Sequence, residues 1–308
     1  SSNDYLSRMD RNRAEYFGLI LLSATGMLLL VGATELITIY IALELTTLPL
    51  IALSSMLFTA KSTEAGMKFL VIGALSSAVM LYGMTLIFGF TGSTTLSGIS
   101  DALALAHDSD IPFGSYAVLV GMLLLIVGFG FKLSAVPYQM WVPDVYEGAP
   151  TPVVTFLSVA SKAAAFALVL RVLCSGFIDL QPEWTILIAC LAAASMTVGN
   201  LAALVQDNIK RLLGYSTIAH AGYILVGIAA IGGDSSSPLF SHMGPSSVLF
   251  YLVAYAAANL TAFFSIIAIG HNINSDLIDD YGGMFRRSPL IALALALSLI
   301  ALIGVPPT

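Results

Sequence analysis

Long apolar stretches are the feature that most constrains this chain. Nine of them approach or exceed the roughly 20 residues that an α-helix needs to cross a bilayer. They are Phe17–Gly32, Thr34–Phe58, Gly66–Phe90, Ser115–Val136, Val153–Ile178, Trp184–Val205, Leu212–Gly232, Ser247–Gly270 and Pro289–Gly304. Charged residues make up only 10% of the chain, against about 25% in soluble domains. The sequence therefore predicts an all-α, polytopic transmembrane helix bundle of about nine spans.

The Lys and Arg residues support this number of spans. When the connections are assigned alternately to two sides, nine basic residues share the side of the N-terminus, and only Arg171 lies on the other. The nine are Arg8, Arg11, Arg13, Lys61, Lys68, Lys210, Arg211, Arg286 and Arg287. The positive-inside rule predicts that their side is cytoplasmic. On the opposite side, Leu96–Ala106 has apolar residues at helical spacing and predicts a short interfacial helix.

Charge and cysteine content exclude other classes of protein. The net charge of −6 argues against a nucleic-acid partner. Two cysteines, Cys174 and Cys190, cannot form a disulfide framework or hold a Cys-ligated cluster. Both lie in apolar runs, where we expect buried hydrophobic side chains. We also expect no bound cofactor and no metal site in this chain, because neither a phosphate-binding glycine motif nor a metal-spaced His/Cys set is present.

Four ionisable residues interrupt the apolar spans. Glu44 and Lys162 lie near the centres of their spans, Lys132 lies near the end of another, and His220 is the ninth residue of a fourth. A charged side chain at the centre of a membrane helix costs about 2.5–3.5 kcal/mol on insertion scales, so such groups usually face the bundle interior or a wet cavity.

Two interpretations of these groups compete. The first is one structural ion pair, such as Glu44 with a lysine, plus a second lysine that reaches the interface. The second is a proton relay, because burial and a nearby carboxylate have opposite effects on a lysine, which then gains or loses its proton when the carboxylate moves. Two buried lysines facing one buried glutamate favour the relay. For His220, a hydrogen-bonded core residue and a relay member are equally consistent with the sequence.

Prolines indicate interrupted helices. The 35 residues from Ser115 to Ala149 would measure roughly 52 Å as one helix, longer than the ~30 Å core of a bilayer, and Pro137 lies within them. Pro306 and Pro307 indicate a second break after the ninth span. Breaks at corresponding positions of two halves are typical of inverted repeats around a shared transport path.

The residues around these positions resemble a known family. The stretches Phe131–Pro137, Trp141–Pro150 and Ser161-Lys162 closely resemble subunit N of proton-pumping NADH–quinone oxidoreductase (respiratory complex I), whose mitochondrial counterpart is subunit 2. The stretches Glu44–Pro49 and Asn208–Tyr223 are similar to further family motifs, and the resemblance extends from about Glu35 onward.

The resemblance implies an antiporter-like fold of fourteen helices with two inverted five-helix repeats, of which this chain would cover the fourth to the twelfth. It also implies that Glu44, Lys132, Lys162 and His220 translocate protons and that Pro137, Pro306 and Pro307 mark helix breaks. We expect residues 1–15 to form a cytoplasmic segment and residues 16–308 a proton-translocating domain. The domain would be a piece of a longer chain whose C-terminal helices are missing.

The expected function is that of a proton-translocating subunit of the NADH–quinone oxidoreductase enzyme, without redox chemistry of its own. FMN, iron–sulfur clusters and quinone would be bound by other subunits. The expected partners are the other membrane and peripheral subunits of complex I, including neighbouring antiporter-like subunits, together with the lipid bilayer. The expected location is the bacterial inner membrane or, alternatively, an organellar energy-transducing membrane.

Three rival functions remain. A subunit of a multi-subunit sodium/proton antiporter or of a membrane-bound hydrogenase would share the Glu and Lys positions. A quinone-binding redox subunit would need a quinone-sized pocket and His pairs for haem, whereas the four His here are scattered. A structural membrane scaffold would tolerate neutral substitutions of Glu44, Lys132 and Lys162.

Overall fold

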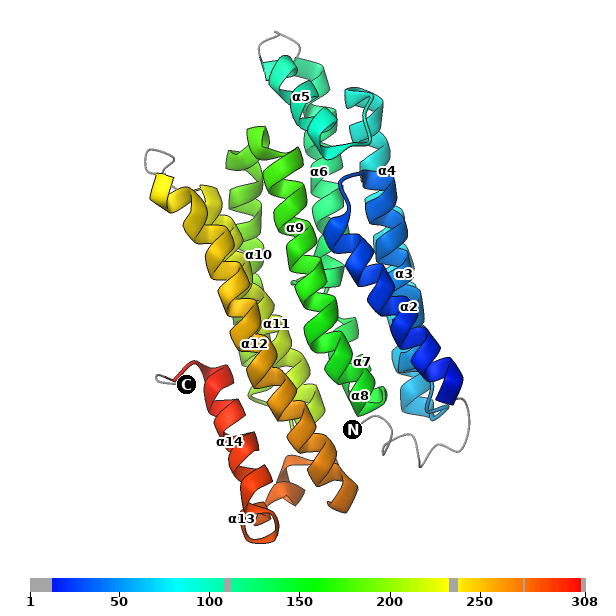
Figure 1. Cartoon of the computed structure of the whole chain (residues 1–308), viewed down its shortest axis with the longest axis vertical. Coiled ribbons are helices and arrows are strands. Elements are labelled where there is room, and N and C mark those ends of the chain that lie inside the picture. Colours follow the sequence, from blue (N-terminus) through cyan, green and yellow to red (C-terminus); the bar gives the residue numbers. More distant parts are fainter. Residues whose placement is uncertain (1–12, 108–111, 233–237, 274, 306–308) are drawn as a thin grey trace.

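The computed structural model describes residues 13–107, 112–232, 238–273 and 275–305, and these form a bundle of helices (Figure 1). Eight helical segments within this described part are long and apolar enough to cross a membrane. They are α2 (Arg13–Gly32), α3 (Leu36–Ser54), α4 (Ala60–Thr91), α6 (Pro112–Leu133), the run of α8 (Thr151–Phe156), η1 (Leu157–Ser161) and α9 (Lys162–Gly176), the run of η2 (Ile178–Leu180) and α10 (Gln181–Ala203), α11 (Ile209–Ala229) and α12 (Pro238–Ile273). The shorter elements are α5 (Leu96–His107), α7 (Trp141–Gly148), η3 (Ala230–Gly232), η4 (Ile278–Tyr281), α13 (Met284–Arg287) and α14 (Pro289–Ile303).

Helices dominate because each satisfies its own backbone hydrogen bonds, which hydrocarbon cannot do. Side chains cap the free amides at the starts of two helices. Thr59 accepts a hydrogen bond from the Ser62 amide at the start of α4, and the Asn208 side chain accepts from the amides of Lys210 and Arg211 at the start of α11. Gly92, with φ of 65°, ends α4 in a left-handed conformation that glycine adopts without strain.

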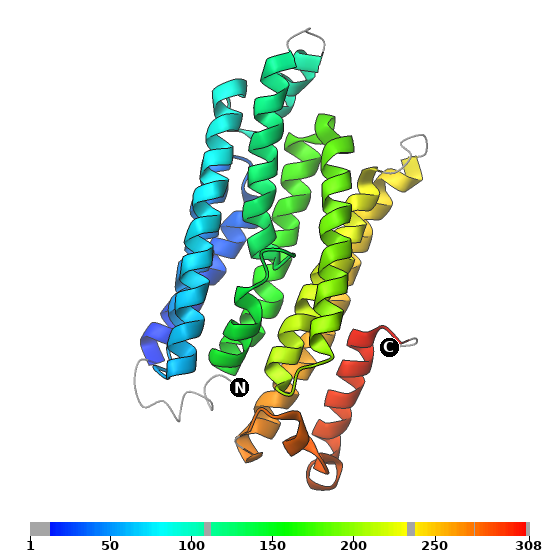
Figure 2. The ribbon, with the colours of Figure 1, turned by 180° about the vertical axis from the view of Figure 1, so that it is seen from behind.

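Two sets of four helices alternate in direction, and the order of directions in one set is the reverse of that in the other. The helices α2, α3, α4 and α6 alternate up, down, up and down as drawn, and α10, α11, α12 and α14 alternate down, up, down and up (Figures 1 and 2). Each set ends in a helix that stops near mid-height of the bundle. This arrangement confirms the predicted antiporter-like fold with inverted repeats and discontinuous helices.

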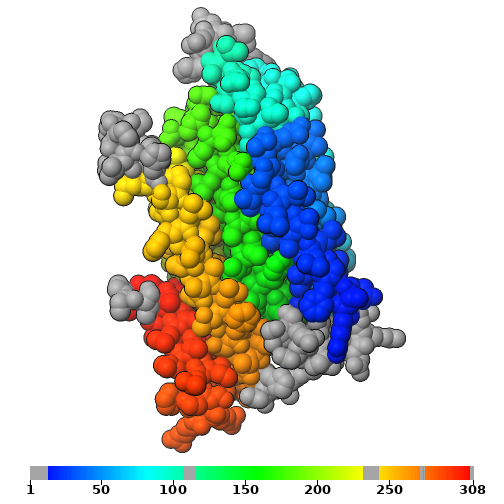
Figure 3. Space-filling model, viewed as in Figure 1, coloured from blue at the N-terminus to red at the C-terminus, as the bar shows by residue number. Residues whose placement is uncertain are grey.

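The helix α9 lies at the centre of this arrangement. In Figure 3 it forms the green band between α2 and α12. In the span that contains α9, 72% of the apolar segment is buried, the highest share among the eight described spans. Small residues allow neighbouring helices to approach closely. A Cβ at Gly199 of α10 would lie 2.6 Å from the Ala219 amide nitrogen of α11, so only glycine fits there.

Most sequence-based predictions of the elements agree with this structure. Eight predicted spans coincide with the long helices, and the interfacial helix is present as α5 at the end opposite α13 (Figure 1). The ninth span is α14, whose 15 residues reach only about 22 Å, too short to cross a bilayer. The prediction that both cysteines are buried was wrong: Cys190 is exposed, and Cys174 is only partly buried. Residues 1–12, Pro306 and Pro307 lie outside the described residues.

Candidate functional site

The site is organised around an interruption between α6 and α7. Helix α6 ends at Leu133, Ser134 has φ of 63°, and the non-helical segment 134–140, which contains Pro137, leads into α7 at Trp141. Figure 2 shows this segment at mid-height of the bundle. Non-helical backbone at membrane depth is tolerated only where protein or a water-filled cavity surrounds it.

Neighbouring side chains satisfy the backbone of this interruption. The Val136 amide donates to the Ser195 hydroxyl of α10 at 2.9 Å, and the Trp141 indole donates to the Phe131 carbonyl at 3.3 Å. The Trp141 ring also stacks on Phe69 of α4, with ring centroids 4.3 Å apart. These contacts fix both ends of the broken helix relative to α4 and α10.

Lys132 is the last but one residue of α6, and its side chain points toward α3. It is 5% exposed, and its ammonium donates to the Thr47 hydroxyl at 2.7 Å. The Thr47 hydroxyl in turn donates to the Leu43 carbonyl of its own helix at 2.6 Å. A buried ammonium therefore rests on a neutral acceptor.

Glu44 lies one turn before Thr47 on α3 and is half-buried. Its carboxylate accepts a hydrogen bond from the Ser77 hydroxyl of α4. Glu44 acts on Lys132 through its charge but forms no ion pair with it in this structure. The ion pair of Glu44 with a lysine, one of the two interpretations of the sequence, is therefore not formed with Lys132. The structure shows two separate polar contacts instead, Glu44 with Ser77 and Lys132 with Thr47.

Lys162 lies on the other side of the interruption, at the start of α9 and directly after the π-helical turn η1. It is 3% exposed, and its ammonium donates to the Leu133 carbonyl at 2.9 Å and to the Thr217 carbonyl at 3.2 Å. Because Leu133 directly follows Lys132, the two lysines flank the same broken end of α6. Single π-helical turns are frequent at functional sites.

His220 lies one turn after Thr217 on α11 and is 6% exposed. Its Nδ1 atom is 2.8 Å from the Tyr251 hydroxyl of α12, and its ring centroid is 5.1 Å from that of Tyr255. Lys162 acts on His220 through its charge. The structure therefore brings Lys132, Lys162 and His220 into one series of neighbours across α6, α9 and α11.

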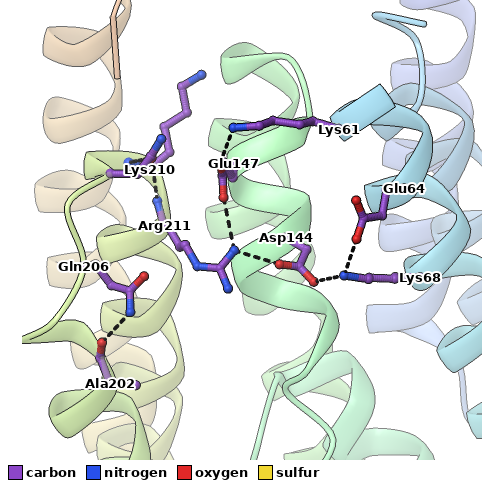
Figure 4. Close-up of polar contacts among 10 residues, drawn as sticks. Lys61, Glu64, Lys68, Asp144, Glu147, Ala202, Gln206, Lys210 and Arg211 are labelled. Carbon is purple, nitrogen blue, oxygen red and sulfur yellow. Dashed lines mark hydrogen bonds and ion pairs between the residues drawn. The ribbon is translucent and has the colours of Figure 1, made fainter. Parts of the chain in front are cut away.

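A network of ion pairs holds α7 at the end of the bundle that carries most basic residues (Figure 4). We call it the α7 network. The Arg211 guanidinium is 2.8 Å from Asp144 and 3.1 Å from Glu147, while Lys68 is 2.7 Å from Asp144 and Lys61 is 2.8 Å from Glu147. Except for Lys68, these residues line a cleft of about 150 Å³. Burial alone would raise the pKa of Glu147, but the hydrogen bonds from Lys61 and Arg211 outweigh it and hold the pKa below its ordinary value.

Several residues of the site were missed in the sequence. They are Thr47, Ser77, Thr217, Tyr251, Tyr255 and Asn259. Those on α12 carry a signal that could have found them, because polar groups recur every four residues in an otherwise apolar helix. Within the part of the chain that the structure describes, no group of three or more His, Cys, Asp or Glu residues is placed to hold a metal ion.

Comparison with known proteins gives consistent matches. Residues 33–308 match the family described as NADH:quinone oxidoreductase/Mrp antiporter, transmembrane. NADH-quinone oxidoreductase subunit N of Dehalococcoides mccartyi is 46% identical over 311 residues, which cover 100% of this chain and 63% of that protein. Subunit N of Moorella thermoacetica is 45% identical, with 99% and 61% covered. This chain thus spans less than two thirds of the length of these relatives.

A solved structure is similar over the same region. A chain of respiratory complex I from Thermus thermophilus with bound aureothin superimposes with a TM-score of 0.75 at 34% identity. The match covers 98% of this chain and 62% of that one. The fold of this chain therefore has a counterpart in a chain of a respiratory complex I structure.

Proposed function

The chain belongs to the NADH:quinone oxidoreductase/Mrp antiporter transmembrane family, and from this premise we propose that it conducts protons within a membrane complex. The energy would come from quinone reduction in other subunits of an NADH–quinone oxidoreductase. The redox cofactors, FMN, iron–sulfur clusters and quinone, would also lie there. The names of the relatives at 45–46% identity support this assignment over a sodium/proton antiporter or hydrogenase subunit.

One observation carries the proposal. Two lysines, each at most 5% exposed, flank the same interruption of α6, and their described hydrogen-bond acceptors are neutral oxygens. A buried ammonium without a contacting carboxylate is costly, so a purely structural role does not explain both residues. A group that gives up its proton for part of a cycle tolerates such surroundings.

Glu44 supplies the switch in this proposal. A carboxylate that approaches a lysine stabilises its ammonium form, and a carboxylate that withdraws favours proton release. Here Ser77 holds Glu44 and Thr47 holds Lys132, an arrangement in which the two charges are separated. The proton released by Lys132 would pass toward Lys162 and then His220. Movement of α3 relative to α6 would return Glu44 to Lys132.

The remaining parts of the proposal concern the assembly. The partners would be the other membrane and peripheral subunits of complex I, including neighbouring antiporter-like subunits. The membrane would be the bacterial plasma membrane, which the bacterial relatives support.

The test uses the full-length subunit in its native complex, in inverted membrane vesicles. We expect Lys132→Ala and Lys162→Gln each to lower the number of protons transported per electron. General acid–base groups typically contribute about 10²- to 10⁴-fold to the steps they serve, so the loss should exceed about tenfold for transport through this subunit. The measurement is the rate of proton uptake divided by the rate of electron transfer.

Arg286→Ala is the matched control. It removes an exposed cation in α13, which precedes the end of α14 that lies away from the site. It should leave the proton-to-electron ratio unchanged. An unchanged ratio in Lys132→Ala, in a complex that assembles at the normal level, would overturn the proposed function.

A further inference from the structure

A row of polar residues lines the contact between α11 and α12. On α11 they recur every three residues and on α12 every four, so each set lies on one face of its helix. They are Thr217, His220 and Tyr223 on α11, and Tyr251, Tyr255 and Asn259 on α12. We call these six residues the polar seam. Only His220 among them was expected to act on protons.

Tyr255 is the centre of the seam. Its hydroxyl is 3.0 Å from the Thr217 hydroxyl, and it accepts a hydrogen bond of 3.0 Å from the Asn259 amide. The same amide donates to the Ser158 hydroxyl at 2.9 Å. Tyr255 is 4% exposed, and Thr217 and Asn259 are each 1% exposed. Because the Asn259 amide already donates to it, the Tyr255 hydroxyl keeps its own hydrogen for another acceptor.

The two ends of the seam contact the groups that the proposed function uses. Lys162 donates to the Thr217 carbonyl, so the lysine ends beside the residue whose hydroxyl pairs with Tyr255. The Tyr255 ring lies against His220, and Tyr251, one turn earlier on α12, is hydrogen bonded to the His220 ring. Tyr255 therefore lies between Lys162 and His220.

A fourth hydroxyl, that of Tyr146, is buried beside these residues. The Tyr146 hydroxyl of α7 lies near the hydroxyls of Thr217 and Ser158. It is buried, yet it has no hydrogen-bond partner among the residues that the structure describes. A buried polar group of this kind is usually satisfied by an ordered water molecule, and three hydroxyls together supply the two to four partners that such a water needs.

We propose that Tyr255 is a further proton-transfer residue, which with Thr217 and one water molecule connects Lys162 to His220. The Lys162 ammonium gives a proton to the water, and the water gives one of its own protons to the Thr217–Tyr255 hydroxyl pair. The pair releases a different proton through Tyr251 to the His220 imidazole. One proton moves in total, the lysine becomes neutral, the histidine becomes imidazolium, and each hydroxyl ends with the proton number it began with.

Packing alone does not require these hydroxyls. Interhelical hydrogen bonds in membranes contribute little to helix association on average, so Phe and Val at these positions would pack α11 against α12 nearly as well. The hydroxyls of Thr217, Tyr255 and Tyr251 lie between the two ionisable groups and can pass a proton, which apolar side chains cannot do.

The test again uses the full-length subunit in its complex, and it rests on the proposed function. Tyr255→Phe and Thr217→Val remove one hydroxyl each and keep the shape of the side chain. We expect each to lower proton transport per electron by at least about tenfold through this subunit, as expected for loss of a proton-transfer group. Thr217→Ser restores a hydroxyl and should transport like the unmodified protein. Tyr82→Phe, on the exposed face of α4, is the matched tyrosine control.

The outcomes separate the two proposals. If Lys162→Gln loses transport while Tyr255→Phe keeps it, the role of Tyr255 is wrong and the proposed function stands. If Thr217→Ser falls as far as Thr217→Val, packing rather than the hydroxyl matters, and the inference is overturned. If Lys162→Gln transports normally, both proposals fail. Should Tyr255→Phe not assemble, the Thr217→Val and Thr217→Ser pair decides the question.

Discussion

Thr47 is the residue that holds the Lys132 ammonium. It is 6% exposed and lies three residues after Glu44, so both side chains project from neighbouring turns of α3. Its hydroxyl accepts from Lys132 and donates to the Leu43 carbonyl, which fixes the orientation of the acceptor. The lysine therefore has a defined position even while Glu44 is engaged with Ser77.

Replacing Thr47 with Val should impair proton transport. The change leaves a buried ammonium without its acceptor, which costs about 1–3 kcal/mol. This energy corresponds to at least about a fivefold decrease in the population of Lys132 that is protonated and correctly oriented. We expect proton transport per electron through this subunit to fall by a similar factor in the full-length protein, whereas Thr47→Ser should retain it.

Thr46→Val is the control for this prediction. Thr46 is equally buried, but its hydroxyl bonds only to the Ala42 carbonyl of the same helix. Its replacement should leave transport unchanged. Equal losses in the Thr46 and Thr47 variants would show that packing of α3, and not the contact with Lys132, is what matters.

At this scale the sequence was informative about charges and silent about their partners. Glu44, Lys132, Lys162 and His220 stand out because ionisable groups are rare in apolar spans. Thr47 does not stand out, because threonines in membrane helices commonly bond to their own backbone, as Thr46 and Thr85 do here. Which hydroxyl meets a lysine depends on the rotation of α3 against α6, and no local pattern encodes that rotation.

The element that most needs support is α7. It has only eight residues, and an isolated helix of this length is not stable in water. Its apolar face packs through Trp141 against Phe69, and its outer end is held by the α7 network through Asp144 and Glu147. The network thereby connects α7 to α4 on one side and to α11 on the other (Figure 4).

Asp144→Asn should loosen α7. Each partly exposed ion pair contributes about 0.2–1 kcal/mol, and Asp144 makes two, so opening of α7 should become easier by about 1 kcal/mol. That change corresponds to roughly fivefold faster hydrogen exchange of the α7 amides, measured by mass spectrometry on the purified complex.

Glu64→Gln is the control, because among the described residues Glu64 forms its ion pair with Lys68 of its own helix and not with α7.

Acidification should act like the Asp144 substitution. Since the pKa of Glu147 is lowered in the folded protein, its stabilising contribution is complete above the ordinary glutamate pKa and is lost as the pH falls through the lowered one. Exchange of α7 that is unaffected by either change would contradict a supporting role for the network.

The sequence predicted the break before α7 but not the network around it. Pro137 and the length of the segment from Ser115 to Ala149 required an interruption. The acidic partners of Arg211 lie more than 60 residues away in the chain, at Asp144 and Glu147. Such pairings form only when the bundle brings α7 and α11 together, so they could not be read from local spacing.

At the scale of the whole molecule, the two inverted sets place two helix ends in the middle of the bundle. Helix α6 ends at Leu133, whose carbonyl accepts from Lys162, and α14 ends beside His220, which interacts with the backbone of Leu302. The C-terminal end of a helix carries a partial negative charge that stabilises cations. Both α6 and α14 thus present their negative ends to a group that can carry a proton.

The distribution of basic residues predicts which end of the bundle faces the cytoplasm. The α7 network, the start of α4 and α13 all lie at one end, and α5 lies at the other (Figure 1). The basic residues are concentrated at the first end, so the positive-inside rule assigns it to the cytoplasm. Asp279 in η4 and Asp101 in α5 are exposed residues at the two ends.

Cysteine labelling tests this orientation. In full-length protein with Cys174 and Cys190 replaced by Ser, Asp101→Cys should react with a membrane-impermeant maleimide in intact cells. An even number of membrane crossings separates Asp279 from the other connections predicted to be cytoplasmic, so it lies on their side. Asp279→Cys should therefore react only in inverted vesicles. Both cysteines should react after detergent solubilisation, which verifies that they are accessible. Labelling of Asp279→Cys in intact cells would place the α7 network outside and contradict the predicted orientation.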